Sequence, residues 1–418
     1  MRPFAVLLGL LAGAVTVSAQ GVDAGALMRA ALQKAQAGDY SAALETMQEA
    51  IALRPAHPAY LYNLACLQNL AGAHEAALTT LQQLAAFGIY TPAAQDSDLA
   101  SLATEPAFQT LTAQFESNRR PRGQVDTAFT LADQTGLIEG IAWHAATNVW
   151  FFGDMHQRCV WRRTSAGKLD QFTAEDAVPF GLGGLVVDEA RGLLWAAGST
   201  QKVTAGWSEA TDGQGALLAF DLTAGELRHT YPVPDDGRAH ATVDLTLGAD
   251  GTVYLSDSTT PVIWRLIPGA EELDNWFEDA RFRSLQGLAL SADGSLLYVA
   301  DYALGLFRIN VATRAIEPLV ATNNTLIGID GLTRHGDALI AVQNGTNPFR
   351  VLRIQPEANS PEVTVRELAA AQPAMSDPTL GGVADGAFHF IGHAGWDKFN
   401  GAKTGASAHG CAILRVGL

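Results

Sequence analysis

Cysteine is scarce in this chain, which has three (Cys66, Cys159 and Cys411) among 418 residues. A small, odd number in so long a chain excludes a scaffold built on disulfides, and neither a Cys-x-x-Cys pair nor a zinc-type spacing occurs. Cys66 falls in a helical pattern, whereas the other two fall in strand-like runs. We therefore expect three buried thiols that serve packing.

Positive charge is also in short supply, with 27 Lys and Arg against 43 Asp and Glu and a formal net charge of −16. This balance argues against a nucleic-acid partner, because phosphates need clustered Lys and Arg. Beyond residue 20 no apolar run approaches the roughly 18 residues that a membrane span requires. An apolar content of 48% with 17% charged residues instead indicates a well-packed globular protein, and the length predicts two or more units.

Several catalytic motifs are missing as well. The chain contains no Gly-x-Ser-x-Gly nucleophile elbow, no Gly-rich phosphate loop and no His-Glu-x-x-His helix. Any chemistry must therefore come from another arrangement of side chains.

The first residues have the pattern of an export signal. Arg2 supplies the positive start, the run 4–17 is apolar, and Val17-Ser18-Ala19 forms a small-residue cleavage site before Gln20. The pattern predicts a signal peptide at 1–19 and a bacterial protein that is periplasmic or secreted.

Residues 20–118 carry a helical repeat. The segments 38–44 and 72–78 match at an offset of 34 residues, which is the tetratricopeptide period, with alanines where paired helices pack closely. Two repeats are fewer than a stable stack needs, so the segment 96–115 is expected to cap them. Such modules bind peptides or proteins, or pack against a neighbouring domain, and both roles remain open. The basic, Pro-containing stretch 119–124 predicts a linker.

The remainder of the chain, 125–418, repeats a strand-rich unit about every 43 to 60 residues. Each unit opens with an apolar run, turns through polar residues and continues with a second apolar run. This pattern is typical of β-propeller blades, and six units are present.

The sixth unit is one strand short, so we expect 124–130 to pair as its outer strand and close the ring. Longer insertions at 200–215 and 396–409 are expected to project over one face.

The openings of the units are Glu139-Gly140, Gly183-Gly184, Val243-Asp244, Gln286-Gly287, Asp330-Gly331 and, more weakly, Gly381-Gly382. Where glycines stand in these openings, close packing of the strands around the axis explains them.

The start of each innermost strand and the end of the second strand meet at one mouth of the central channel. Oxygen-bearing side chains gather at this mouth, and such ligands suit hard divalent cations. The strand-start positions are Glu139, Gly183, Val243, Gln286, Asp330 and Gly381, and the strand-end positions are Asp154, Ser199, Asp257, Asp301, Asn344 and His393.

These residues resemble the senescence marker protein, gluconolactonase and luciferin-regenerating enzyme group of six-bladed propellers, over roughly 125–418. Glu139-Gly140 is similar to the group's first metal carboxylate, and Ile329-Asp330-Gly331 to its Asp-Gly metal ligand and base. Two departures are visible. Gln286 stands where an Asn is usual, and Val243, followed by Asp244, stands where Asn is common.

The resemblance implies a lactone or ester hydrolase in which a divalent metal polarises the carbonyl and Asp330 acts as base. Ca²⁺ is the expected ion, with Mg²⁺, Mn²⁺ or Zn²⁺ as alternatives. The predicted metal ligands are Glu139, Gln286, Asp330 and Asp244, and the predicted substrate-binding residues are Asn344, His240, His156, Asp257, Asp301 and His393. For Asp257 and Asp301 a second role is equally open, in which they tie strand ends to neighbouring turns. The alternative is a non-enzymatic propeller that binds a ligand while the helical repeats recruit a protein. The predicted fold class is thus an N-terminal all-α tetratricopeptide-like domain followed by an all-β six-bladed propeller.

Overall fold

A computed structural model describes residues 23–131, 136–357, 360–399 and 410–418 of the chain. The predicted signal peptide at 1–19 lies outside these residues. Within them, no helix is both long and apolar enough to cross a membrane. All three cysteines are buried free thiols, as expected, and burial raises the pKa of the Cys66 thiol to about 12.

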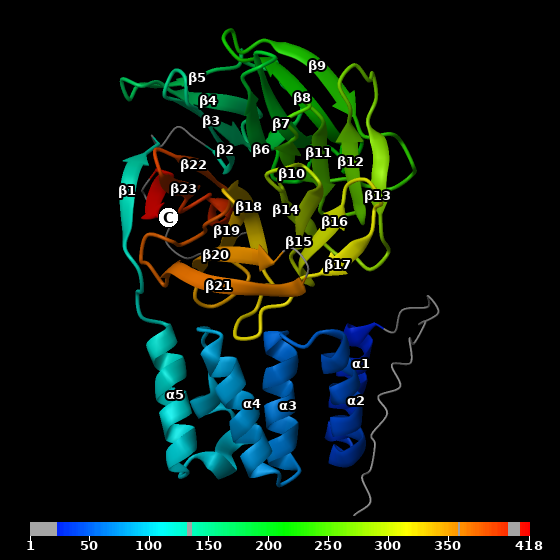
Figure 1. Cartoon of the computed structure of the whole chain (residues 1–418), viewed down its shortest axis with the longest axis vertical. Helices are drawn as coiled ribbons and strands as arrows, with labels where there is room; N and C mark the ends of the chain where they lie inside the picture. The colour runs from blue at the N-terminus through cyan, green and yellow to red at the C-terminus, as the bar shows by residue number, and fades with distance from the viewer. Residues whose placement is uncertain (1–22, 132–135, 358–359, 400–409) are drawn as a thin grey trace, which may run out of the picture.

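The N-terminal part is a row of five α-helices beneath the propeller (Figure 1). Gly38 and Gly72, the two glycines of the 34-residue repeat, end helices with φ of 81° each, a conformation that side chains other than glycine rarely adopt. Ala31, Ala43, Ala65 and Ala77 are fully buried between the helices. A helical N-terminal module is thus confirmed, and its tetratricopeptide character stays a prediction. Its elements are α1 (Ala24–Gln36), α2 (Tyr40–Leu53), α3 (Pro58–Leu70), α4 (His74–Ala86), the 3₁₀ turns η1 (Ala93–Gln95) and η2 (Ser97–Leu102), and α5 (Pro106–Asn118).

Six four-stranded antiparallel sheets form the propeller, as predicted. Blade one is β2 (Ile138–His144), β3 (Val149–Asp154), β4 (Cys159–Arg163) and β5 (Leu169–Gln171), and blade two is β6 (Gly181–Asp188), β7 (Leu193–Ser199), β8 (Gly215–Asp221) and β9 (Leu227–Pro232). Blade three is β10 (Thr242–Leu247), β11 (Val253–Asp257), β12 (Val262–Leu266) and β13 (Asp274–Glu278), and blade four is β14 (Leu285–Leu290), β15 (Leu296–Asp301), β16 (Gly305–Asn310) and β17 (Ile316–Pro318). Blade five is β18 (Ile329–His335), β19 (Ala338–Gln343), β20 (Arg350–Glu357) and β21 (Ser360–Ala370), and blade six is β22 (Gly381–Ala384), β23 (Ala387–Ile391), β24 (Ala412–Gly417) and β1 (Val125–Thr130), with the 3₁₀ turn η3 (Trp396–Lys398) between β23 and β24.

The ring closes by pairing the first strand with the last. β1 runs antiparallel to β24, with Val125 opposite Val416 and Thr130 opposite Ala412. This is the predicted completion of blade six. It leaves no open sheet edge between the last blade and the first.

Each of the first five inner strands carries an extra residue at the same place. In β18, for example, Ile329 pairs with Gln343 but Leu332 pairs with Ala341, so three steps on one strand match two on the other. The equivalent irregularities occur in β2, β6, β10 and β14. A β-bulge bends the strand and redirects its side chains. The bulges lie where Glu139, Gly183, Val243, Gln286 and Asp330 stand.

Glycines beside these bulges let neighbouring inner strands approach closely. A Cβ atom on Gly140 would lie 2.0 Å from the carbonyl oxygen of Gly183, and one on Gly331 would lie 2.8 Å from that of Thr379. Gly184 and Gly287 are crowded in the same way. This confirms that close packing around the axis explains the repeated glycines. In blade three the equivalent residue is Asp244, whose carboxylate therefore projects into the channel.

Two arginines hold the helical module against blade five. Arg122 donates to both oxygens of Glu367 on β21, at 2.7 and 2.9 Å, and to the carbonyl oxygen of Gly88 after α4. Arg350 of β20 is fully buried and donates to the carbonyl oxygen of Phe87, to Asn324 and to Gln343. Packing against the propeller, one of the two roles left open by the sequence, is thus realised.

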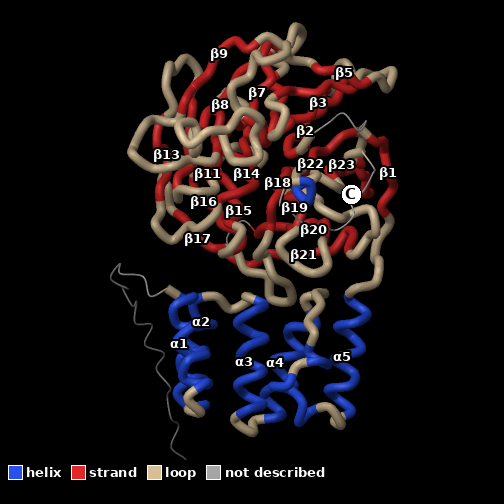
Figure 2. Tube along the Cα trace, turned by 180° about the vertical axis from the view of Figure 1, so that it is seen from behind, coloured by secondary structure: helices blue, strands red, loops and turns tan. Residues whose placement is uncertain are grey.

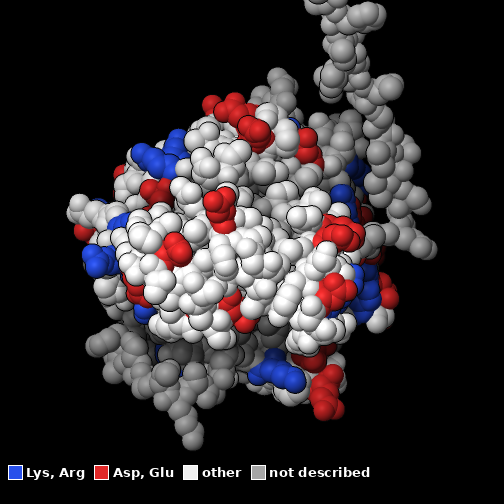
Figure 3. All heavy atoms as spheres, turned by 90° about the horizontal axis from the view of Figure 1, so that it is seen from below, with Lys and Arg blue, Asp and Glu red and all other residues white. Residues whose placement is uncertain are grey.

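Charged residues are dispersed on the face that the far ends of the helices form. Figure 3 shows single acidic and basic groups separated by uncharged surface, with no broad basic patch on this face. That distribution agrees with the low Lys and Arg content of the chain and gives a polyanion no continuous footprint there.

Replacement of Arg350 by Met should weaken the joint between the two units. The change removes a buried guanidinium and leaves the Phe87 carbonyl and the Asn324 and Gln343 amide oxygens without their donor, so the free energy of unfolding in urea should fall by about 2–4 kcal/mol. Arg366→Met on the exposed side of β21 is the matched control, with an expected change within about 0.5 kcal/mol. Equal effects of the two variants would show that the Arg350 contacts contribute nothing.

Candidate metal site at the channel mouth

Four carboxylates from different blades face one another at one mouth of the channel. Burial, followed by repulsion from Asp330, Asp377 and Asp244, holds the pKa of Glu139 well above its usual range. Glu139 and Asp330 retain some solvent accessibility, but protein surrounds both, and this desolvation is the largest cause of their raised pKa values. Glu139 and Asp330, predicted to face each other across the axis, are thus close enough to repel.

Asp330 is held by Asn344. The amide nitrogen of Asn344 donates to Asp330 Oδ2 at 2.6 Å and to the carbonyl oxygen of Pro378 at 2.9 Å. Burial raises the pKa of Asp330 to about 6, the Asn344 hydrogen bond opposes this rise, and repulsion from Asp377 adds to it. Asn344 Oδ1 is buried and accepts no hydrogen bond. The prediction that Asn344 belongs to the site thus gains a geometric basis beside Asp330.

Asp244 lies one residue farther along its inner strand than Glu139 and Asp330 do on theirs. The residue is 8% exposed, and its Oδ1 accepts the N–H of Leu245 at 2.8 Å. Burial raises the pKa of Asp244 to about 8, and repulsion from Asp330 contributes to the shift. Because Asp244 occupies the glycine position of the repeat, it stands between the mouth and the rest of the channel.

Asp377 and Trp396 are site residues that the sequence did not reveal. Trp396 of η3 donates its backbone N–H to Asp377 Oδ2 at 3.0 Å and its indole N–H to Glu139 Oε1. Both residues come from blade six, whose opening is the least regular of the six. Gly331 packs against Thr379 rather than Gly381, so Thr379 is the spatial equivalent of Asp330 and the alignment of this unit shifts by two residues.

The other predicted ligand, Gln286, stands on the bulge of β14. Its amide nitrogen donates to Ser284 Oγ at 3.1 Å. Val243 occupies the same place in blade three and brings an apolar side chain to the mouth. The two departures noted in the sequence therefore fall on adjacent inner strands. Glu139, Asp330 and Asp377 stand on blades one, five and six, and Asp244 alone stands on blade three.

Two predicted substrate-binding carboxylates fasten strand ends. Asp301 accepts N–H groups of Arg283, Ser284, Ala303 and Leu304, at 2.6 to 3.0 Å. Asp257 accepts those of Ala241, Thr259 and Thr260 and also pairs with His240 Nδ1 at 2.7 Å. These hydrogen bonds outweigh the effect of burial and lower the pKa of Asp257. Asp154 makes equivalent bonds in blade one. Backbone donors therefore account for both carboxylates.

The three predicted histidines lie in different surroundings. His240 is buried between Asp257 and Asp236, within the hydrogen-bond network that holds the strand end of blade three. His156 contacts the carbonyl oxygen of Val203 at 2.6 Å, in the blade-two insertion, and its ring centre is 4.5 Å from that of Phe399. His393 is buried and contacts Ser376 Oγ at 3.0 Å. His156 and His393 thus border loops of the mouth, whereas His240 belongs to a strand-end anchor.

The mouth carries the type of ligand that a hard cation prefers. Glu139, Asp330 and Asp377 supply carboxylate oxygens and Asn344 supplies a buried oxygen that lacks a donor, which is the chemistry that Ca²⁺ prefers. Within the described residues, the ligand atoms that approach to within 4.8 Å as a group belong instead to Cys66, Asp96 and Asp98. There Asp96 already accepts hydrogen bonds from Tyr62 and from the Asp98 backbone, and the Cys66 thiol is protonated at neutral pH. The mouth carboxylates are spaced more widely.

Stability in the presence of a chelator should fall as pH rises from about 4 to 8. The pKa values of Asp330 and Asp244 are raised to about 6 and about 8, so the folded protein binds more protons than the unfolded chain in this window. Urea unfolding at several pH values measures the slope, which Asp330→Asn should flatten. A slope unaffected by Asp330→Asn would contradict the electrostatic account.

Comparison with known proteins gives the fold and no closer relationship. No protein-family model matches the chain, and no curated protein matches it. Among solved structures, a PQQ-bound aldose sugar dehydrogenase from Streptomyces coelicolor matches with a TM-score of 0.51 and 12% identity, over 71% of this chain and 98% of its own. A gluconolactonase from Xanthomonas campestris matches with a TM-score of 0.48 and 16% identity, over 69% and 88% of the two chains. A luciferin-regenerating enzyme matches with a TM-score of 0.48 and 14% identity, over 71% and 96%. At these identities the similarity establishes the propeller fold alone.

Proposed function

We propose that the chain is an exported, divalent-metal-dependent hydrolase of lactones or related esters. The observation that carries this proposal is the group of carboxylates around Glu139 and Asp330, together with the unpaired oxygen of Asn344. Like charges in a desolvated mouth oppose folding, so a protein that keeps them has a use for them. Export rests on the predicted signal peptide at 1–19.

Glu139, Asp330, Asp377 and Asn344 would hold the metal, with Ca²⁺ as the first choice. When bound, such an ion polarises an ester carbonyl and stabilises the negative charge that develops on its oxygen. Gln286 and Asp244 are further candidates, on the neighbouring strand and in the layer below. Oxygen ligands from several rigid strands favour this type of ion over zinc.

Asp330 is the candidate base. A carboxylate whose pKa lies near 6 is mostly deprotonated at neutral pH and remains basic enough to take a proton from water. The Asn344 amide engages Oδ2, so Oδ1 is the oxygen that would take the proton. His156 and His393, in loops that border the mouth, remain candidates for contact with the substrate.

Trp396 would form one wall of the substrate site. Its indole ring is placed over Glu139 by two hydrogen bonds, one from the backbone to Asp377 and one from the ring to Glu139. An apolar wall excludes water from the carbonyl, which strengthens every electrostatic interaction inside the mouth. The ring face also suits the flat side of a cyclic ester.

A panel of γ- and δ-lactones, assayed with added Ca²⁺, tests the reaction. Asp330→Asn should reduce kcat by about 10²–10⁴-fold, the usual contribution of a general base. Glu139→Gln should raise the Ca²⁺ concentration needed for half-maximal activity. The control is Asp293→Asn, in an exposed turn between β14 and β15, which should behave as the unaltered protein. Stoichiometric metal binding without turnover of any lactone would favour the binding-protein alternative.

Terbium luminescence tests the position of the metal without relying on activity. Tb³⁺ occupies calcium-type oxygen sites, and an indole ring in contact with such a site transfers its excitation to the ion. Trp396→Phe should remove most of the sensitised emission, because Trp396 touches Glu139. Trp143→Phe should preserve the emission, because Trp143 lies at the other end of β2 from Glu139. Equal emission from the two variants would place the ion away from this mouth.

A further inference from the structure

Blade five breaks a charge pattern that four other blades share. In each of those blades an arginine on the third strand forms an ion pair with an acidic residue directly opposite it on the outer strand. The pairs are Arg162–Asp170, Arg265–Asp274, Arg308–Glu317 and Arg415–Asp126, at 2.5 to 3.4 Å. By strand register the equivalent arginine of blade five is Arg353, and the residue opposite it is Arg366. Blade two has Ala219 at this place.

Arg353 and Arg366 have no acidic partner. Like charges directly opposite each other destabilise a sheet. Among the described residues, the terminal carboxylate of Leu418 included, none forms an ion pair with either arginine. Arg353 is half-buried and donates to His335 Nδ1 at 3.3 Å. Because a guanidinium can only donate, Nδ1 accepts and the ring proton stands on Nε2. Two cations and a further donor thus lie together with no acid to balance them.

A pocket of about 520 Å³ opens at these side chains. Cross-strand neighbours share one face of a sheet, and this face of blade five looks toward blade six, where Leu418 packs against the core between the two blades. The strands β18 to β21 follow one another outward from the axis (Figure 2). The residues that line the pocket are His335, Arg353, Gln355, Thr364, Arg366 and Leu418.

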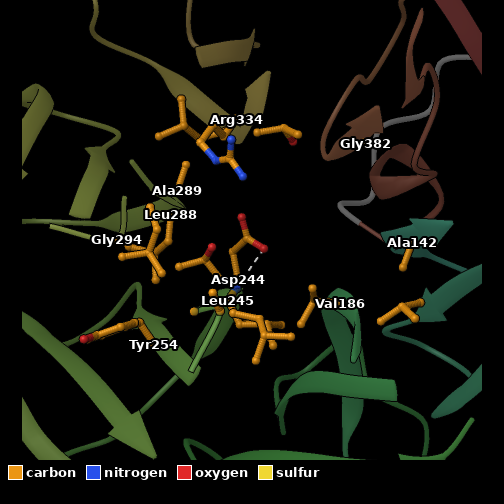
Figure 4. A pocket seen from close by; sticks show the side chains of 18 of the residues that line it. Ala142, Val186, Asp244, Leu245, Tyr254, Leu288, Ala289, Gly294, Arg334 and Gly382 are labelled. Carbon is orange, nitrogen blue, oxygen red and sulfur yellow. Dashed lines mark hydrogen bonds between the residues drawn. The ribbon is translucent and has the colours of Figure 1, made fainter. Parts of the chain in front are cut away.

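The pocket is separate from the central channel and from the candidate metal site. Figure 4 shows Arg334 extending into the channel. Successive residues of a strand point to opposite faces, so His335 points away from the channel wall that Arg334 forms. β18 begins beside Asp330 and ends at His335, which places the two sites at opposite ends of this strand. The inference below therefore goes beyond the proposed hydrolase function.

We propose that this pocket binds the phosphate group of a small molecule. A phosphate carries a charge near −2 at neutral pH and offers three acceptor oxygens. It would therefore satisfy both guanidinium groups and accept from His335 Nε2 as well. A carboxylate has two oxygens, which a single arginine engages in a bidentate contact, so two arginines favour the phosphate. The volume of about 520 Å³ leaves space for the organic part of a phosphate monoester.

Calorimetric titration of the full chain with inorganic phosphate, without added Ca²⁺, tests the proposal. Arg353→Gln should weaken phosphate binding at least about tenfold, the equivalent of about 1.4 kcal/mol. Arg366→Glu supplies the acid that four other blades have opposite their arginine. It should abolish phosphate binding and raise the melting temperature in phosphate-free buffer, so that the loss of binding is not a loss of the fold.

Arg334→Gln is the matched control, because it removes the same charge from the neighbouring residue on the channel side. Its phosphate affinity should stay within about twofold of the unaltered protein at physiological ionic strength, where salt screens the more distant charge. Absence of binding at millimolar phosphate, or equal affinity in Arg366→Glu and Arg334→Gln, would overturn the proposal.

Two further titrants define the ligand. Ribose 5-phosphate should bind more tightly than inorganic phosphate if the natural ligand is an organic phosphate, and less tightly if it is the free ion. Succinate, a dianion without a tetrahedral group, should bind more weakly than either. Succinate affinity equal to that of phosphate would show that the pocket selects charge alone and would refute the phosphate assignment.

Discussion

The close approach of the inner strands around the axis is the constraint on which the rest of this structure depends. Gly140, Gly184, Gly287 and Gly331 allow neighbouring backbones to come so near that a single Cβ atom would collide. A bulge beside each of these positions then redirects one side chain. Residues at the bulges of separate blades consequently meet over the axis.

Carboxylates at these positions carry an electrostatic cost. Glu139, Asp244 and Asp330 all have raised pKa values, with burial as the largest cause and mutual repulsion adding to it. Asp257 and Asp301 show the opposite solution, in which backbone N–H groups surround the carboxylate and stabilise a strand end. The same residue type thus serves function or architecture according to the donors within reach.

The helical module and the propeller are joined by directional polar contacts. Arg350, on β20 of blade five, donates to the carbonyl oxygen of Phe87 at the end of α4. Arg122 joins the segment after α5 to Glu367. Asn344, which holds Asp330, lies six residues before Arg350 on the same blade. The blade that supplies the candidate base therefore also supports the helical module.

Much of the fold was determined by the sequence itself. The repeated openings predicted six blades, the missing strand of the last unit predicted the pairing of β1 with β24, and the 34-residue repeat predicted a helical N-terminal module. These features are local patterns of hydrophobicity and turn residues, which a chain displays before it folds. Glu139, Asp330 and Asn344 could be placed near one another for the same reason, because equivalent strand ends of a propeller share one mouth.

Only the tertiary structure decided the surroundings of each side chain. Asp377 and Trp396 lie in the irregular blade-six segments, where no repeat pattern indicates which residue faces the axis. For Asp257 and Asp301 the sequence left a ligand role and a strand-end role open, and the backbone donors that folding brings to them decide for the second. Local patterns specify elements, whereas hydrogen-bond partners, burial and charge neighbours arise from segments far apart in the chain.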